Sequence, residues 1–282
     1  MRRLRFKDSL AMFKFFGLFL DFLRDIYRNK FVIYQLTKRD YKNRYIGSFL
    51  GFIWTIIQPF VMILVLWLVF VKGFKAGDLP GEVPFIAYLS LGVIAWDLFS
   101  SVLMTSTNVF HEYSYLVKKI NFRIAILPIV KLLSSFITHV IFICIGIVIL
   151  LVSGVEVSWW WVQVVYYLFA LMVLLLGLSW ITSSLQVFVK DVVQVINVIL
   201  QFGFWFTPIV WDFNLVPQHY EWFFRLNPMF YIVEGYRKSF IYGEPFWGDL
   251  EFALYYWVVT LAILLVGVLL FKRLRPHFAD VL

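Results

Sequence analysis

Five long stretches of the sequence carry no Asp, Glu, Lys or Arg, and they constrain the fold more than any other feature. They cover residues 46–71, 132–155, 157–189, 192–211 and 252–271. A helix rises about 1.5 Å per residue, so about 20 apolar residues cross a hydrocarbon core of about 30 Å. Every stretch reaches that length. Because 62% of all residues are hydrophobic and only 15% are charged, the chain is expected to fold in a membrane and not around a soluble core.

A sixth apolar stretch, residues 85–110, contains a single acid, Asp97. We therefore predict six spans and assign the chain to the all-α integral membrane proteins. No linker, repeat or low-complexity segment divides it. The predicted organisation is an N-terminal segment 1–45, one six-span transmembrane domain 46–271 and a tail 272–282.

The basic residues are distributed unevenly between the two ends of the predicted spans. Of 25 Lys and Arg residues, 20 fall on the side that carries both termini. The other five are Lys72, Lys75, Arg225, Arg237 and Lys238. Lys and Arg in short flanks stay on the cytoplasmic side, so both termini are predicted to be cytoplasmic. This bias explains the net charge of +8 without a nucleic-acid partner, because no soluble domain carries a basic stripe.

The segment before the first span favours an amphipathic helix that lies in the membrane interface. Its apolar face carries Phe22, Ile26, Ile33 and Leu36. Its polar face carries Arg24, Arg28, Gln35 and Arg39. The pattern fits an apolar side in the acyl boundary and cations toward lipid phosphates. Two interpretations stay open at this point, a membrane anchor only or a role in handling the substrate or a partner.

The segment 111-HEYSYLVKKINFRIAILP-128 follows the second predicted span, and we call it the docking loop. It combines an apolar patch, Tyr115, Leu116 and Ile120, with Lys118 and Lys119. A solvated connection does not need three large apolar groups. The loop is therefore a candidate for docking against a soluble partner, and burial of the patch in the membrane interface is the alternative.

The longest segment on the other side, residues 212–247, has six Phe and four Tyr but is broken by Pro217, Pro228 and Pro245. Irregular backbone at membrane depth must be buried in protein or line water. We therefore predict short re-entrant helices between spans five and six. Glu234 and Arg237, at i and i+3 on such a helix, are expected to pair.

No catalytic constellation is present in the sequence. The four histidines, His111, His139, His219 and His277, have no metal-ligand spacing, so no metal site is expected. The run 243-GEPFWG-248 resembles a phosphate-binding loop, but Asp249 stands where such a loop needs lysine. The chain is therefore predicted to be a transport subunit without a cofactor of its own, and its energy must come from another subunit.

Two sets of residues are candidates for a channel lining. Asp97 lies well inside a span, where a charge costs about 2.5 to 3.5 kcal/mol unless it faces water or a partner. It is either a pore-lining group or an acid held by Ser100, Ser101 or another helix, and a lone acid argues against a proton relay. The run 202-FGFWF-206 places Phe202, Phe204, Trp205 and Phe206 in span five. Aromatic faces stack on sugar rings, so an aromatic pore suits a glycan; ordinary lipid-facing or core aromatics are the alternative.

Gly47 and Gly51 fall at the start of the first predicted span. Small residues four apart let another helix approach the backbone closely. We interpret the pair as a packing seam for another helix or for a second copy of the chain. A tolerated pair on an uncrowded face is the alternative.

Five stretches together resemble the permease subunits of type-two ABC exporters of the polysaccharide branch, which export O-antigen, capsule or teichoic-acid chains. The first run is 39-RDYKNRYIGSFLGFIWTIIQP-59 and the second is 116-LVKKINF-122 with 126-ILP-128. The others are Lys190-Asp191, 207-TPIVW-211 and 227-NPMFYIVEGYR-237, in the order of the family. The sequence departs from the family pattern at Arg123, Ile124, Ala125, Lys190 and Thr207.

The resemblance implies a homodimer with two copies of a separate ATPase subunit, which binds ATP and Mg. The cargo would be a lipid-linked polysaccharide, most simply O-antigen, moved out of the cytoplasm across the bacterial inner membrane through a channel shared by the two copies. The ATPase-coupling residues would be Tyr115, Leu116, Val117, Lys118, Lys119, Ile120 and Phe122. The external motif would be Asn227, Pro228, Glu234 and Arg237.

The lipid pyrophosphate of such a cargo is expected near the cations of the inner surface, because phosphates favour Arg forks. These cations are Arg24, Arg28, Arg39, Lys42 and Arg44. Two competing functions are an exporter of a drug or lipid with the same architecture, and a membrane-embedded glycosyltransferase or polymerase. The second is disfavoured because it needs acidic catalytic residues near a membrane face.

Overall fold

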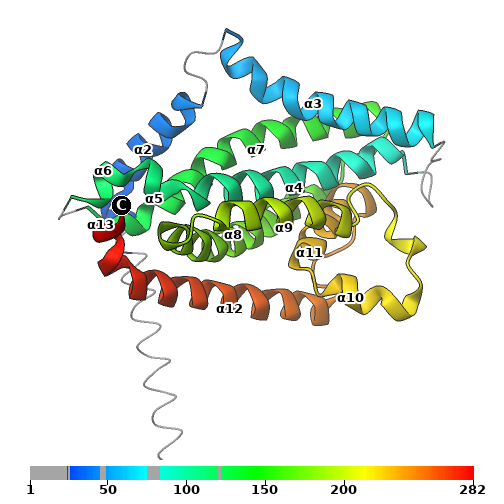
Figure 1. Ribbon diagram of the computed structural model, residues 1–282. Helices are drawn as coiled ribbons and strands as arrows, with labels where there is room; N and C mark the ends of the chain where they lie inside the picture. The colour runs from blue at the N-terminus through cyan, green and yellow to red at the C-terminus, as the bar shows by residue number, and fades with distance from the viewer. Residues whose placement is uncertain (1–23, 25, 45–48, 75–82, 120–121) are drawn as a thin grey trace, which may run out of the picture.

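The computed structural model describes residues 24, 26–44, 49–74, 83–119 and 122–282 of the chain. Within these residues the chain forms helices joined by short loops (Figure 1), which confirms the all-helical class. Gly47 and Ile120 lie outside the described residues, as does Phe22.

Five helical segments are long and apolar enough to cross a membrane: Trp54–Gly73, Phe85–Thr107, Ile124–Val152, Trp159–Phe188 and Leu250–Val281. Their main helices are α3 (Trp54–Trp67), α4 (Phe85–Thr107), α7 (Leu127–Val152), α8 (Val164–Phe188) and α12 (Leu250–Leu274). A π-helical turn, Leu68–Gly73, extends α3.

The fifth predicted span, residues 192–211, corresponds to a shorter helix, α9 (Val192–Phe206), of 15 residues. Thr207 has extended backbone, φ −79° and ψ 134°, as expected for a residue that precedes a proline. At about 1.5 Å per residue, α9 alone is shorter than the hydrocarbon core. The count of six spans therefore stays a prediction.

The first span also starts later than the uncharged stretch suggested. Gly51 has φ +48°, a left-handed conformation that glycine adopts without strain. Regular α-helix begins at Trp54. Gly51 thus precedes the spanning helix instead of occupying its first turn.

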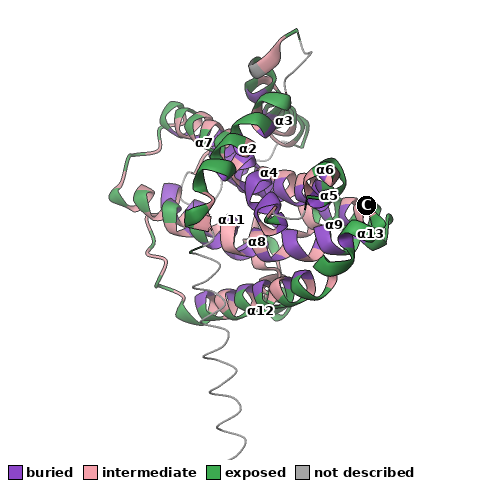
Figure 2. Ribbon diagram, turned by 90° about the vertical axis from the view of Figure 1, so that its left-hand side faces the viewer, coloured by how far each residue is buried: buried purple, intermediate pink, exposed green. Residues whose placement is uncertain are grey.

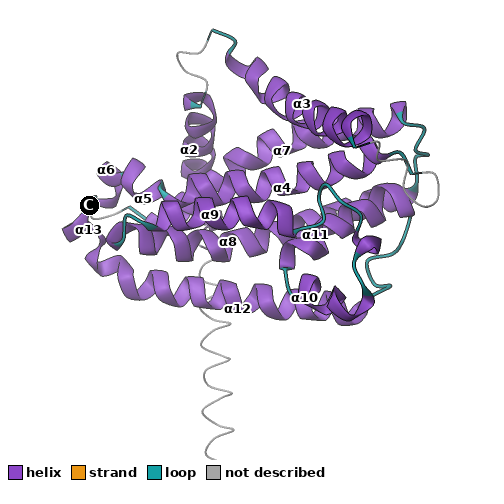
Figure 3. Cartoon of the chain, turned by 45° about the vertical axis from the view of Figure 1, so that its right-hand side comes forward, coloured by secondary structure: helices purple, strands orange, loops and turns teal. Residues whose placement is uncertain are grey.

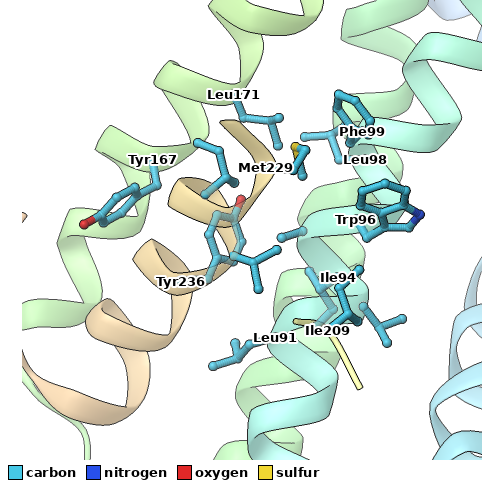
Figure 4. Packing of buried hydrophobic residues seen from close by; sticks show 14 of the residues in the cluster. Leu91, Ile94, Trp96, Leu98, Phe99, Tyr167, Leu171, Ile209, Met229 and Tyr236 are labelled. Atoms are coloured by element: carbon cyan, nitrogen blue, oxygen red, sulfur yellow. The ribbon is translucent and has the colours of Figure 1, made fainter. Parts of the chain in front are cut away.

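Helix α4 lies at the centre of the bundle and is in contact with α3, α7, α8 and α9. Figure 2 shows α4 mostly buried and α3 mostly exposed. Figure 4 shows the buried side chains around α4: Leu91 and Ile94 pack between α4 and its neighbours. Trp96 lies on the side of α4 that faces away from Tyr236 of α11 (Pro228–Arg237). Helix α12 packs along α8 on the outside.

The bundle has two distinct ends, which are visible in Figures 1 and 3. The basic end carries α2 (Lys30–Asn43), α5 (Val109–Glu112), α6 (Ser114–Val117) and α13 (Phe278–Val281). The aromatic end carries α10 (Glu221–Arg225) and α11. The docking loop and the C-terminus thus share an end, as the charge distribution predicts. That this end faces the cytoplasm stays a prediction.

Candidate functional site: a groove between the two ends

A groove runs along α3 and α4, with α9 on its other side in one part and α7 in the other. It consists of two adjoining cavities of about 700 and 510 Å³. Gln58, Asp97 and Ser100 line both cavities, so the two are continuous. Each cavity alone has a volume within the usual range of protein sites for organic ligands, about 300 to 1,000 Å³.

The larger cavity lies toward the aromatic end and has a mixed lining. Its polar side chains include Gln58, Asp97, Ser100, Asn197 and Gln201. Its aromatic side chains are Trp96, Phe204 and Trp205. This combination offers hydrogen-bond partners beside flat apolar faces, which is the chemistry that a sugar ring uses.

The smaller cavity extends the groove toward the basic end. Arg44, Thr55, Ser101 and Thr138 contribute its polar lining. Arg44 Nη2 donates to Ser135 Oγ over 3.0 Å. The Arg44 guanidinium therefore stands at the basic end of the groove.

Asp97 lies in the wall of the groove, and its part in a channel stays a prediction. Ser100 Oγ donates to the backbone oxygen of Asp97 over 3.2 Å, and Ser101 Oγ lies 3.4 Å from Ser135 Oγ. The side chain of Asp97 lines both cavities. The geometry supports a groove-lining acid.

The aromatic residues of span five point in different directions from α9, and only two of them line the groove. Phe204 and Trp205 line the groove. Phe202 is 74% exposed and is absent from that lining. Phe206 turns toward the aromatic end, where its ring stacks on Phe224 at 4.8 Å. Sequence reasoning missed Trp96, which meets Phe204 at 6.1 Å; its place next to Asp97 was the available signal.

An ion cluster ties α2 to α7 at the basic end. The Lys131 ammonium donates to Asp40 and lies 2.7 Å from a carboxylate oxygen of Glu112. Arg44 approaches the second oxygen of Asp40 at 3.5 Å. Tyr113 OH donates to Asp40 over 3.2 Å. One cluster thus joins α2, the docking loop and the start of α7.

The electrostatics of this cluster favour its charged form. Burial alone would raise the pKa of Asp40, but the charge and hydrogen bond of Lys131, with smaller contributions from Ser134 and Arg44, hold it below 3.8. Burial, Asp40 and Glu112 raise the pKa of the Tyr113 phenol. Tyr113 therefore keeps its proton and remains a donor to the Asp40 carboxylate.

Part of the apolar face of α2 packs against protein, whereas the sequence pattern predicted that it lies in the membrane interface. Ile33 packs with Ile126 and Ile129, and Leu36 lies against the same cluster. These two residues contact α7 and its start instead of lipid because that surface offers complementary apolar side chains. Four of the five predicted phosphate-binding cations stay exposed: Arg24, Arg28, Arg39 and Lys42. The fifth, Arg44, turns into the groove.

The docking loop presents only part of its predicted surface. Tyr115, Lys118 and Lys119 are exposed. Val117 is buried in a cluster that includes Leu127 and Trp180. Leu116 and Phe122 are half-buried against that cluster. Val117 therefore holds the loop in place, and the exposed residues are available to a partner.

The predicted external motif builds and anchors α11. Asn227 Oδ1 caps the helix by accepting from Met229 N over 3.0 Å, and Pro228 follows at the first helical position. Both residue types favour helix starts. Asn227 Nδ2 also donates to Thr207 Oγ1 over 2.8 Å. The motif thus fixes α11 against the turn that ends α9.

Arg237 is fully buried at the other end of α11. Its Nη1 donates to Glu234 Oε1 over 2.6 Å, which confirms the expected pair. Nη2 donates to the Ile209 carbonyl over 3.1 Å, and the guanidinium lies 3.3 Å above the Tyr88 ring. Arg237 therefore fastens α11 to α4 and to the turn that follows α9.

The position that a Cβ on Gly51 would take is uncrowded: apart from its chain neighbours, no atom of the described residues lies within 4 Å of it. The described residues thus show no close helix approach on that side of Gly51, and contact with a second copy stays a prediction. Among the described residues, no group of three or more His, Cys, Asp and Glu side chains could hold a metal ion.

We expect Asp40→Asn to loosen α2 from α7 by roughly 1 to 3 kcal/mol, because Arg44 and Lys131 lose their buried carboxylate. Cysteines at Ile33 and Ile129, in a chain whose exposed Cys144 is changed to serine, report the contact through a short thiol crosslinker. Crosslinking should fall in Asp40→Asn and persist in Arg39→Gln, the exposed neighbour. Equal yields would contradict the assigned role.

The same crosslink should depend on pH in one direction. Because the folded pKa of Asp40 is depressed, its contribution is complete at neutral pH and is lost as the pH falls through that folded value, below about 4. Crosslinking in the protein with Asp40 intact, normalised at each pH to the reaction rate of an exposed cysteine because only the thiolate reacts, should therefore be constant from pH 8 to 5. A loss on the alkaline side would show that another group controls the contact.

Comparison with known proteins points to transport. A family model described as ABC-2 type transporter matches residues 32–241. The O-antigen export system permease protein RfbA of Klebsiella pneumoniae is 23% identical over 249 residues, which cover 88% of this chain and 93% of that protein. RfbA of Myxococcus xanthus is 25% identical over 264 residues, which cover 92% and 98%.

Proposed function

Because the chain belongs to the ABC-2 type transporter family, we propose that it is the membrane-spanning subunit of an ATP-driven exporter of a lipid-linked polysaccharide, most simply O-antigen. Two copies share one channel, and two copies of a separate ATPase bind ATP and Mg. The assembly lies in the bacterial inner membrane with both termini in the cytoplasm. The names of the similar permeases support the choice of cargo.

The observation that carries this proposal is the groove from Arg44 to Trp205. A sugar hydroxyl left in hydrocarbon without a partner costs several kcal/mol, so a glycan needs a polar route. Gln58, Asn197 and Gln201 offer such partners, and the neighbouring aromatic rings offer stacking faces. A second copy would close the groove against lipid along the exposed sides of α3 and α9.

The proposed path begins at the cations of the basic end. Arg24, Arg28, Arg39 and Lys42 gather the lipid pyrophosphate, and Arg44 receives it at the mouth of the groove. Closure of the ATPase pair pushes on the docking loop. This movement shifts α3 and α9 and opens the groove past Asp97 and Trp205.

Capsular polysaccharide and teichoic acid fit the same groove and are alternative cargoes. A drug or small lipid is the less favoured alternative, since such a cargo does not require paired polar and aromatic walls along the whole path. A small apolar cargo would tolerate removal of the aromatic rings, which separates it from a glycan.

Charge reversal at Lys118 and Lys119 is expected to weaken ATPase binding at least tenfold, because both side chains are exposed on the docking loop. Co-purification of the tagged chain with its ATPase measures the effect. Lys72→Glu, a charge reversal in the π-helical turn that extends α3, serves as the control and should bind normally. Normal complex formation and export in the double variant would refute the coupling assignment.

The function itself is tested in a strain whose O-antigen permease has been deleted. Co-expression of this chain with its cognate ATPase should restore long O-antigen chains on surface lipopolysaccharide, provided that ATP hydrolysis is intact. Intracellular accumulation of lipid-linked glycan despite normal levels of both subunits would argue against the proposal. If the complex exported only capsule or teichoic-acid precursors, that polymer would be identified as the cargo.

A further inference from the structure

His111 forms a hydrogen bond between the docking loop and the end of α8. His111 Nε2 lies 3.3 Å from the backbone carbonyl oxygen of Gln186. A carbonyl oxygen only accepts, so His111 must donate from Nε2 in this contact. The last carbonyls of a helix lack partners within the helix, and His111 satisfies one of those of α8.

The side chain of Gln186 extends in the other direction, toward α9. Its Oε1 accepts from the backbone N of Val193 over 3.2 Å. Helix α9 begins at Val192, so the Val193 amide is one of the first four that no intrahelical carbonyl can satisfy. Gln186 is buried, so water does not readily replace this bond.

The C-terminal segment packs over the same junction. Phe278 is completely buried, although the tail was predicted only as a cytoplasmic extension. Its ring lies 5.0 Å from Phe110 of α5, 5.9 Å from Phe271 of α12 and 6.0 Å from Phe188 at the end of α8. Figure 1 shows α13 beside α5 at the basic end.

We propose that Gln186 is a positioning residue that transmits movement of the docking loop to α9, with Phe278 bracing the junction. The inference rests on the proposed function. Helix α9 carries Asn197, Gln201 and Trp205 into the groove. A displacement of His111 thus reaches the groove wall through the two hydrogen bonds of Gln186, at the end of α8, and through α9.

The test compares Gln186→Leu with Gln186→Glu in the complete complex with its ATPase. Leucine fills similar space but accepts no hydrogen bond, whereas glutamate keeps an acceptor for the Val193 amide. In proteoliposomes with lipid-linked glycan, Gln186→Leu should keep its complex and its ATP hydrolysis while glycan exported per ATP falls about tenfold. Gln186→Glu should restore most of the export. A parallel loss of complex, hydrolysis and export would mean that the residue is only structural and would overturn the proposal.

A readout that does not depend on the cargo separates this proposal from the proposed function. Hydrogen exchange of residues 192–200 is followed with and without a non-hydrolysable ATP analogue on the ATPase. The unmodified complex should show an ATP-dependent change in α9 that Gln186→Leu abolishes and that Phe278→Ala weakens, with Phe278→Leu retaining it. An unchanged response in Gln186→Leu would refute the relay. A normal relay in a complex that exports no glycan would refute the proposed function alone.

Discussion

Replacement of Arg237 by leucine is expected to destabilise the chain by about 3 to 5 kcal/mol, the usual cost of breaking a buried ion pair by removing one partner. The change leaves the Glu234 carboxylate and the Ile209 carbonyl without their donor. It also removes the cation above the Tyr88 ring. Since these contacts hold α11 against α4 and the turn after α9, little folded protein should reach the membrane.

Thermal unfolding of the purified chain in detergent measures this effect. Arg237→Lys should be intermediate, because an ammonium keeps the charge but cannot reproduce the planar fork. Lys238→Ala is the matched control, since its side chain pairs with Glu244 over 3.3 Å and both groups are partly exposed. That variant should differ by less than about 1 kcal/mol. A stable Arg237→Leu protein would show that α11 is held by apolar packing alone.

The double variant Phe204→Ala, Trp205→Ala is expected to reduce glycan export roughly tenfold. Each aromatic contact is worth about 0.5 to 1.5 kcal/mol beyond the area it buries, and a loss of about 1.4 kcal/mol corresponds to a factor of ten. Both residues line the groove. The measurement is surface O-antigen, normalised to the amount of permease in the membrane.

Phe202→Ala provides the control on the same helix. Phe202 is an aromatic residue of the same run that faces away from the groove lining, so its removal should leave export within about twofold of normal, a difference of about 0.4 kcal/mol. If the double variant exports glycan normally, the aromatic wall is not a contact surface for the cargo. Equal losses in both variants would indicate a general effect on α9 or on assembly.

Much of the fold follows from local patterns in the sequence. Uncharged stretches predict the long helices because length and hydropathy are local properties. The i, i+3 spacing of Glu234 and Arg237 predicts their pair for the same reason. Asn227 and Pro228 mark the start of α11 through capping preferences that need no tertiary contact.

The site required contacts that no local pattern contains. Arg44 and Ser135 are 91 residues apart in the chain. The groove that Asp97 lines is formed by helices that come before and after it in the sequence. The inward position of Val117 and the burial of Phe278 depend on apolar surfaces supplied by other helices. The start of the first span could not be predicted either. Composition favours a helix from residue 46, but the positive φ of Gly51 is incompatible with regular helix at that position.

Direct contact between cargo and groove is the central claim, and site-specific photo-crosslinking tests it. A photoreactive amino acid replaces Gln201, which lines the groove, or Val198, an exposed residue of the same helix outside that lining. With radiolabelled glycan in actively exporting membranes, position 201 should capture cargo in an ATP-dependent manner and position 198 should not. Continued export without capture at position 201, or equal capture at both positions, would contradict passage through this groove.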